Sequence, residues 1–177
     1  MKKKTLALVL ALTLLVAGVV GGTLAWLTDQ TAEVKNTFTV GDINIGLTET
    51  TADYKMVPGN TIAKDPTVTV KANSEACWLF VKVTESADLK DFITYAIAEG
   101  WTALSGVDGV YYREVPASAA DQTFSVLADD AVTVKSDVTR TMLETAKTDA
   151  PTLTFQAYAI QKDHFATADA AWAEVSK

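Results

Sequence analysis

The sequence predicts an all-β protein in which two antiparallel sheets pack face to face as a sandwich, with a short C-terminal helix. Two observations lead to this fold class. Several short runs alternate between apolar and polar residues, which is the period of a strand with one buried face. Glycine, proline, asparagine and aspartate separate these runs at short intervals, as turn residues do in sheets built from hairpins.

The first predicted strand extends from Thr37 to Leu47 and changes its buried face at Gly41. The buried set is Phe38 and Val40 before that glycine, and Ile43, Ile45 and Leu47 after it. Because strand side chains alternate with a period of two, this switch requires one extra residue, and Gly41 is the expected bulge. A polar, turn-like stretch from 48 to 60 follows. The next strand covers Thr67–Ala72, with its valines directed inward.

The run Ala76–Thr84 is largely apolar on both faces, which predicts a central strand that is covered on each side. Cys77 lies in this run and is expected to be a small buried hydrophobe, since no neighbouring base or cation lowers its pKa. It is the only cysteine in the sequence, so no intramolecular disulfide can form.

The remaining strands are predicted from shorter runs. Residues 86–99 are expected to form a polar turn and then a strand through Ile93, Tyr95 and Ile97, with a helical turn over Asp88–Ile93 as the alternative. Further strands are predicted at Trp101–Leu104, Val110–Val115, Thr123–Leu127, Val132–Lys135 and Thr152–Gln161. The first two of these form a hairpin around the turn residues 105–109.

Two stretches have helical spacing. Residues 136–148 are expected to form a short helix or an irregular crossover. Ala166–Val175 is rich in alanine, and Ala168, Ala171 and Trp172 fall on one stripe of a helix. This C-terminal helix is therefore predicted to pack Trp172 against the domain.

The first 25 residues have the layout of a secretory signal peptide. Lys2–Lys4 precede an apolar run, two glycines end it, and the small residues Thr23 and Ala25 come just before Trp26. We predict cleavage between Ala25 and Trp26. This leaves one domain, 26–177, with a flexible N-terminal arm over 26–36. The alternative is a permanent membrane anchor, because Leu6–Ala25 has the length of a minimal spanning helix, about 20 residues.

Four stretches of the chain resemble the TasA/CalY (camelysin) family of secreted Gram-positive proteins. These stretches are Gly22–Asp29, Asn36–Ile43, Met56–Asn60 leading to Lys64–Val70, and Leu153–Gln161. The resemblance implies a jelly-roll fold and cleavage of the signal peptide by a SipW-type signal peptidase. It also implies a subunit of biofilm-matrix fibres, located in the extracellular matrix or on the cell surface of a Gram-positive bacterium.

The charge of the chain argues against nucleic acid as a partner. The formal net charge is −7, and removal of residues 1–25, which carry three lysines and no acid, takes it to −10. A protein this acidic repels phosphate backbones and anionic lipid surfaces. Contact with a membrane is therefore expected only through the uncleaved signal peptide.

Camelysin is described as a metalloprotease, but the residues for such a site are not in this sequence. A zincin motif, H-E-x-x-H, needs two histidines one helical turn apart, and His164 is the only histidine. No G-x-S-x-G nucleophile elbow accompanies it. Loop acids at Asp129–Asp130, Asp163 and Asp169 lack calcium-loop spacing and are expected to be solvated. We predict no catalytic residue, no metal ligand and no cofactor.

Aromatic residues offer a further possibility, a platform for carbohydrate or a protein partner. The candidates are Trp26, Trp78, Trp101, Trp172, Tyr111 and Tyr112. Packing in the core or on a sheet face is the preferred interpretation, because each tryptophan lies within an amphipathic element. Of the set, the pair Tyr111–Tyr112 is expected to leave one ring exposed.

The sequence thus favours a secreted structural subunit. After cleavage, the new amino end from Trp26 to about Val40 is the candidate donor strand for an open sheet edge of a neighbouring copy. Its apolar residues are Trp26, Leu27, Val34, Phe38 and Val40. The expected partners are the signal peptidase, other copies of the chain and other matrix proteins. The alternatives are an envelope-bound metalloendopeptidase of the camelysin type and a monomeric surface-adhesion module.

Overall fold

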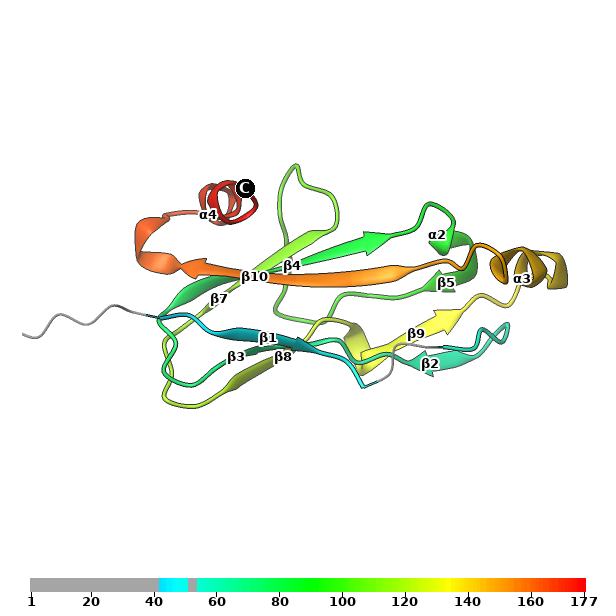
Figure 1. The fold of residues 1–177 in the computed structure, drawn as a ribbon, viewed down its shortest axis with the longest axis horizontal. Coiled ribbons are helices and arrows are strands. Elements are labelled where there is room, and N and C mark those ends of the chain that lie inside the picture. Colours follow the sequence, from blue (N-terminus) through cyan, green and yellow to red (C-terminus); the bar gives the residue numbers. More distant parts are fainter. Residues whose placement is uncertain (1–41, 51–53) are drawn as a thin grey trace, which may run out of the picture. The chain divides into compact units, whose positions relative to one another are not determined.

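The computed structural model describes residues 42–50 and 54–177, which belong to one compact unit of the chain (Figure 1). The predicted signal peptide, the cleavage residues Thr23, Ala25 and Trp26, and the arm over 26–36 lie outside the described residues. The same holds for the part of the first predicted strand that contains Phe38 and Val40. Those predictions stay predictions.

The all-β, antiparallel fold class is confirmed, since every strand pairing in the described part of the chain is antiparallel. We name the sheets A, B and C. Sheet A has the order β1 (Ile45–Thr48), β3 (Thr67–Val70), β8 (Gln122–Ser125). Sheet B has the order β2 (Thr61–Ala63), β9 (Ala131–Val134), β5 (Ile93–Thr94). Sheet C has the order β10 (Leu153–Gln161), β4 (Cys77–Glu85), β7 (Val110–Val115), β6 (Thr102–Ala103).

The prediction of two sheets needs a correction, because the described strands form three. Sheets A and B are successive parts of one layer that is interrupted between β2 and β3 and between β8 and β9. Between β2 and β3, Pro66 has no N–H to donate to a strand ladder. Between β8 and β9, Asp129 and Asp130 have φ angles of 57° and 48°, which a strand does not adopt. The strand ladder is therefore interrupted on both segments. Two hydrogen bonds still cross the interruption, from Lys64 N–H to Asp130 O (2.7 Å) and from Val126 N–H to Pro66 O (2.9 Å).

Sheet C forms the other layer, and its inner face packs on sheet A (Figure 1). The buried core between them contains Val68, Val70, Cys77, Leu79, Val81, Val83, Val115 and Val126. A second core lies under sheet B. It contains Leu89, Phe92, Ile93, Leu127, Val132, Val134, Val138 and Ala146, with Leu153 and Phe155 of β10 packed against it. The start of β10 therefore contacts both cores.

Strand β4 is covered on both faces, as its sequence predicts. Leu79 and Val81 face sheet A, whereas Trp78 and Phe80 face the C-terminal helix α4 (Ala168–Val175). The rings of Phe80 and Trp172 lie 5.3 Å apart, which confirms the predicted packing of Trp172. Cys77 is fully buried and has no disulfide partner, and burial raises the pKa of its thiol to about 11. It is the buried hydrophobe that was expected.

Short helices connect the strands. They are α2 (Leu89–Phe92), the 3-10 turn η1 (Ala128–Asp130), α3 (Arg140–Ala146) and the 3-10 turn η2 (Lys162–His164). Thr139 and Thr167 cap α3 and α4, because each side chain accepts a hydrogen bond from the backbone N–H of the third residue of its helix. The helix α3 is one of the two predicted forms of 136–148. Among the described residues, no helix is long and apolar enough to span a membrane.

The prediction for residues 86–99 is wrong in part. The alternative, a helical turn, forms as α2, and only Ile93 and Thr94 follow in a strand. Ile97 makes a single bridge to Leu127 instead of continuing β5. Alternation of Ile93, Tyr95 and Ile97 therefore reflects contact with both cores and not a continuous ladder.

The predicted hairpin is confirmed as β6 and β7, and its turn contains two glycines with positive φ, Gly106 (73°) and Gly109 (71°). A Cβ on Gly109 would lie 2.4 Å from the backbone oxygen of Val83, whereas a Cβ on Gly106 would have nothing within 4 Å. Gly109 is therefore required for close approach to β4, and Gly106 only for its φ angle.

This difference predicts two separable losses of stability. Gly106→Ala should lower the free energy of unfolding by about 1 kcal/mol, the cost of a left-handed alanine. Gly109→Ala should lose about 1–3 kcal/mol more, because the backbone of β4 has to shift. Denaturant unfolding of both variants measures the difference. Equal losses would contradict the assigned role of Gly109.

Candidate functional site

Strand β10 is a long edge strand. It pairs with β4 over all nine of its residues, and no other strand of the described chain pairs with its second edge. The other outer strands of sheets B and C are much shorter: β2 has three residues, and β5 and β6 have two each. An unpaired edge of this length exposes a row of backbone donors and acceptors.

The hydrogen bonds between β4 and β10 show which residues of β10 direct their backbone N–H and C=O groups to the open edge. Ser86 N–H donates to Thr152 O, and Lys162 N–H donates to Ala76 O, both at 2.9 Å. Even-numbered residues of β10 are therefore the hydrogen-bonded ones at both ends of the ladder. In an antiparallel pair, hydrogen-bonded and non-hydrogen-bonded residues alternate. The even-numbered residues of β10 therefore bond to β4. The residues that direct N–H and C=O to the open edge are Leu153, Phe155, Ala157, Ala159 and Gln161.

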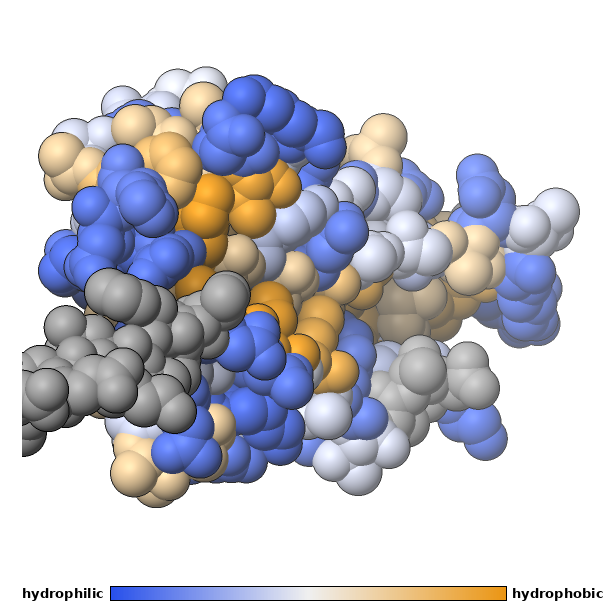
Figure 2. Space-filling view, turned by 60° about the vertical axis from the view of Figure 1, so that its left-hand side comes forward, coloured by the Kyte–Doolittle hydropathy of each residue, from blue (hydrophilic) through white to orange (hydrophobic). Residues whose placement is uncertain are grey.

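The side chains of these outward-bonding residues, except Gln161, pack partly buried against the core between sheets A and C. Figure 2 shows apolar side chains reaching the surface between the layers, with polar side chains above and below them. An added strand could thus bury alternate side chains here while it pairs with the backbone of β10.

Strand β1 presents a second edge beside β10 (Figure 1). Lys71 N–H donates to Asn44 O at 2.8 Å, and Asn44 is opposite Lys71 in the register with β3. By the same alternation, Ile45 and Leu47 direct their backbone groups away from β3. Leu47 is 36% exposed, which is high for a large apolar side chain at the border of a core.

A groove of about 290 Å³ lies between these strands. It is lined by Leu47, Thr48, Glu49, Pro66, Leu153, Thr154 and Phe155. We call the facing edges of β1 and β10, together with this groove, the seam. In the seam two strand edges have no ladder partner. The strands β1 and β10 lie close together there, and the groove opens between them at the Leu47 and Leu153 end.

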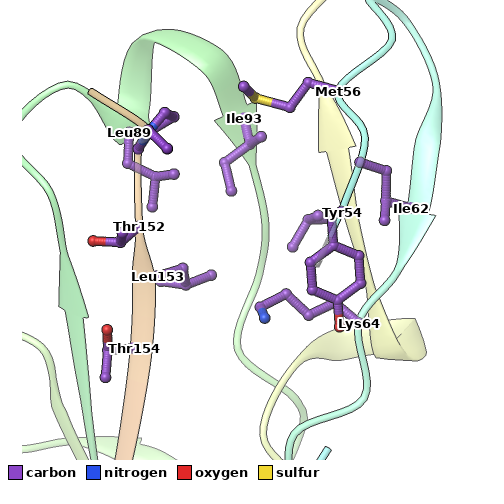
Figure 3. A pocket seen from close by; sticks show the side chains of 12 residues that line it. Tyr54, Met56, Ile62, Lys64, Leu89, Ile93, Thr152, Leu153 and Thr154 are labelled. Atoms are coloured by element: carbon purple, nitrogen blue, oxygen red, sulfur yellow. The ribbon is translucent and has the colours of Figure 1, made fainter. Parts of the chain in front are cut away.

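A larger cavity, of about 430 Å³, adjoins the groove at the Leu153 end of β10 (Figure 3). Leu153 and Thr154 line both spaces. Its apolar wall comes from the loop before β2, from β2, α2, β5, β9 and β10, and contains Met56, Ile62, Leu89, Ile93, Val132 and Leu153. We call this space the end cavity.

Lys64 is the charged residue of the end cavity and is only 7% exposed. Its Nζ lies 2.6 Å from Oε1 of Glu49, 4.6 Å from the ring centre of Tyr54 and 5.4 Å from that of Phe155. The Tyr54 hydroxyl donates to the same Glu49 oxygen at 2.8 Å, and burial together with this carboxylate raises the pKa of Tyr54. The ammonium is therefore compensated by a carboxylate, so the cavity carries no unbalanced lysine charge.

The residues considered as catalytic or metal-binding groups do not lie together in one site. His164, Asp163 and Asp169 are exposed near the start of α4, while Asp129 and Asp130 lie at η1. Within residues 42–50 and 54–177, no three His, Cys, Asp or Glu side chains form a group able to hold a metal ion. Asp130 differs from the expected solvated acid, since it is half-buried and its Oδ1 has no hydrogen-bond partner there.

The aromatic residues that the structure describes pack inside it. Trp78 and Trp172 are buried beneath and within α4, and Trp101 is half-buried and donates from Nε1 to Ser125 O at 2.8 Å. The prediction that Tyr111 or Tyr112 leaves a ring exposed is wrong, because both are half-buried. Tyr112 packs edge-on against Trp78 outside β4, and Tyr111 packs against the inner core.

Arg113 is a second cation that sequence reasoning did not single out. Its guanidinium lies 3.9 Å from the ring centre of Phe124 and 5.4 Å from that of Trp101. Its Nε is buried without a hydrogen-bond partner in the described chain, and burial lowers the pKa of the group. The aromatic faces stabilise this cation in place of a carboxylate.

Comparison with family models, with curated proteins and with solved structures found no match for this chain. The resemblance to the TasA/CalY family therefore remains an expectation from the sequence motifs.

The Lys64–Glu49 pair predicts a stability effect at the seam. Glu49→Gln leaves a buried ammonium without its counterion and should lower the free energy of unfolding by about 1–3 kcal/mol, less than for a fully buried pair because Glu49 is partly exposed. Glu144→Gln is the matched control. It breaks an exposed pair with Lys147 and should cost under about 0.5 kcal/mol. Denaturant unfolding compares them, and equal small losses would contradict a structural role for the buried pair.

Proposed function

We propose that this protein is a secreted structural subunit of cell-surface or biofilm-matrix fibres of a Gram-positive bacterium, related to the TasA/CalY proteins. Its jelly-roll-like body accepts the extended N-terminal arm of another copy, after cleavage of the signal peptide. The observation that carries this proposal is the open edge of β10 in the seam.

The composition of β10 is compatible with the addition of a further strand to its open edge. Natural proteins protect exposed edges with lysine, proline, bulges or short strands. The segment Leu153–Gln161 reads LTFQAYAIQ, with no charged residue and no proline, and it is nine residues long. The edge therefore has none of the sequence features that normally prevent strand addition.

The arm matches the seam in pattern and in length. Val34, Phe38 and Val40 have strand spacing and share one face, with polar neighbours between them. Residues 26–40 extend to about 50 Å at ~3.3 Å per residue, and the nine residues of β10 need about 30 Å. The arm is therefore long enough to cover the whole edge and still reach its own body.

The two alternative functions receive no specific support from the described residues. Trp78 and Trp172, candidates for an adhesive platform, are buried, and Trp101 is half-buried. His164 stands in an exposed turn without a second histidine anywhere in the sequence. The fibre subunit is the function that the seam supports best.

The proposal predicts that assembly depends on the arm. The form that begins at Trp26 should polymerise with rising concentration, whereas a form that lacks residues 26–36 should stay monomeric, because it cannot pair along the seam. Sedimentation velocity and electron microscopy of both purified forms measure this. If both stay monomeric at high concentration, or both polymerise equally, assembly through the arm is wrong.

A change in the acceptor edge gives an independent prediction. Ala157→Pro removes an N–H that points away from β4, so the β4–β10 ladder is kept but a donor strand loses a hydrogen bond. The variant should fold and bind the arm poorly, with at least a tenfold higher concentration needed for polymers. Ala157→Ser keeps the N–H and should polymerise normally. Equal polymerisation of the two folded variants would place the acceptor edge elsewhere.

A further inference from the structure

The wall of the end cavity is apolar over most of its surface. Ile62, Ile93 and Leu153 point into the space from three different strands, β2, β5 and β10 (Figure 3). Val132 of β9, which lies opposite Ile62 in the strand register, also lines the cavity. Strands of sheets B and C therefore hold this wall in place.

The two ends of the end cavity differ in polarity. Figure 3 shows Lys64 and Tyr54 beside each other at one end and Met56 at the other. The ammonium of Lys64 lies between the Tyr54 ring and Leu153 in this view, directed into the space. An elongated molecule with an apolar tail and one polar end therefore matches the cavity better than a molecule that is polar throughout.

The ammonium of Lys64 has hydrogen-bonding capacity left for a ligand. It carries three N–H donors. Its Nζ donates to Glu49 Oε1 at 2.6 Å, and within the described residues it contacts no second oxygen acceptor. Its other neighbours are the ring faces of Tyr54 and Phe155, with centres at 4.6 Å and 5.4 Å, and a ring face is a much weaker acceptor than an oxygen. Because Lys64 is only 7% exposed, a ligand oxygen in the cavity can fill this place.

The ion pair selects a ligand without charge. Lys64 and Glu49 already balance each other, so a ligand carboxylate would have to share the ammonium with Glu49. Two carboxylates on one ammonium repel each other, and the net charge of −7 on the chain adds to this repulsion. A hydroxyl or carbonyl oxygen accepts a hydrogen bond from Lys64 without this cost.

The volume of the end cavity limits the size of the ligand. An apolar cavity of about 150 Å³ holds benzene, which has six non-hydrogen atoms. In proportion, the 430 Å³ of the end cavity hold up to about 17 non-hydrogen atoms. The volume also lies in the range of ordinary small-molecule sites, about 300–1,000 Å³.

We propose that the end cavity binds an uncharged amphiphile, an aliphatic chain of about eight to twelve carbon atoms with a terminal hydroxyl or carbonyl group. The chain contacts the apolar wall, and the oxygen accepts a hydrogen bond from Lys64. This binding activity goes beyond the proposed fibre function and does not depend on it, because its evidence involves neither the N-terminal arm nor an open strand edge.

Octan-1-ol and octanoate test the proposal, because they share a chain length and differ in the charge of the head group. Each is titrated at pH 7 into the form that begins at Trp26, which contains every described residue, and backbone amide NMR shifts are followed. Octan-1-ol should saturate at one molecule per chain and shift the amides of Ile62, Ile93 and Val132. Octanoate should bind at least tenfold more weakly.

The comparison of the two probes needs no variant and can fail in three ways. Absence of saturable octan-1-ol binding, octanoate that binds as tightly as the alcohol, or shifts confined to residues outside the cavity would each overturn the proposal. Shifts of the cavity amides with protein concentration alone would show that a second copy fills the space, and would overturn it as well.

Filling the cavity tests the location of the site. Ile62→Trp places a larger side chain in the space and should weaken octan-1-ol binding at least tenfold. Met56→Trp, at the other end, is a second filling variant in case the first does not fold. Val57→Trp is the matched control, since Val57 is 49% exposed and does not line the cavity. Equal affinity of a folded filling variant and the control would place the binding site elsewhere and overturn the proposal.

Removal of the donor tests the polar contact. Lys64→Met keeps an unbranched side chain but has no N–H to donate, so it should weaken octan-1-ol binding at least tenfold. Lys147→Met, at the exposed pair with Glu144, is the control and should bind like the parent protein. If folded Lys64→Met binds octan-1-ol as tightly as the control, Lys64 does not hold the head group and the proposed ligand class is wrong.

Discussion

The pairing of β10 with β4 is the constraint on which the rest of the structure depends. This nine-residue ladder fixes two faces at once. On the inner face it places Leu153 and Phe155 against both buried cores, and on the outer face it places Tyr158 under the ring of Trp172 in α4. Both faces of β10 are used for packing, so only its edge remains available for a partner. The end cavity lies between the start of the same strand and the three strands of sheet B.

The Lys64–Glu49 pair has a comparable role at the junction of sheets A and B. Lys64 follows β2, and Glu49 follows β1, so the ion pair joins the last residues of an edge strand to the interruption of the layer. A buried ammonium with one carboxylate and two aromatic rings around it is costly to displace. It therefore ties the end of β1 to the residue that follows β2, beside Phe155 of β10.

Strands and helices that depend on local periodicity could be predicted from the sequence. Features that depend on contacts between distant segments could not. The central strand β4, the last strand β10, the hairpin of β6 and β7 and the C-terminal helix all follow from patterns within one segment. The division of one layer into sheets A and B does not, because it arises from the missing N–H of Pro66 opposite two residues with positive φ more than sixty positions later. No structural role could be assigned to Lys64 from the sequence, since lysine is rarely buried and its partner Glu49 comes from a separate part of the chain. The end cavity likewise draws its wall from several distant segments.

The net charge of the protein opposes non-specific association through the open edge of β10. Without residues 1–25 the chain has a net charge of −10, so two copies repel each other at distances where no strand is paired. This repulsion is screened beyond about 8 Å at physiological ionic strength, whereas backbone hydrogen bonds and apolar contacts act only on touching surfaces. The acidic surface therefore disfavours direct edge-to-edge association of two β10 strands, although β10 itself carries no charged residue.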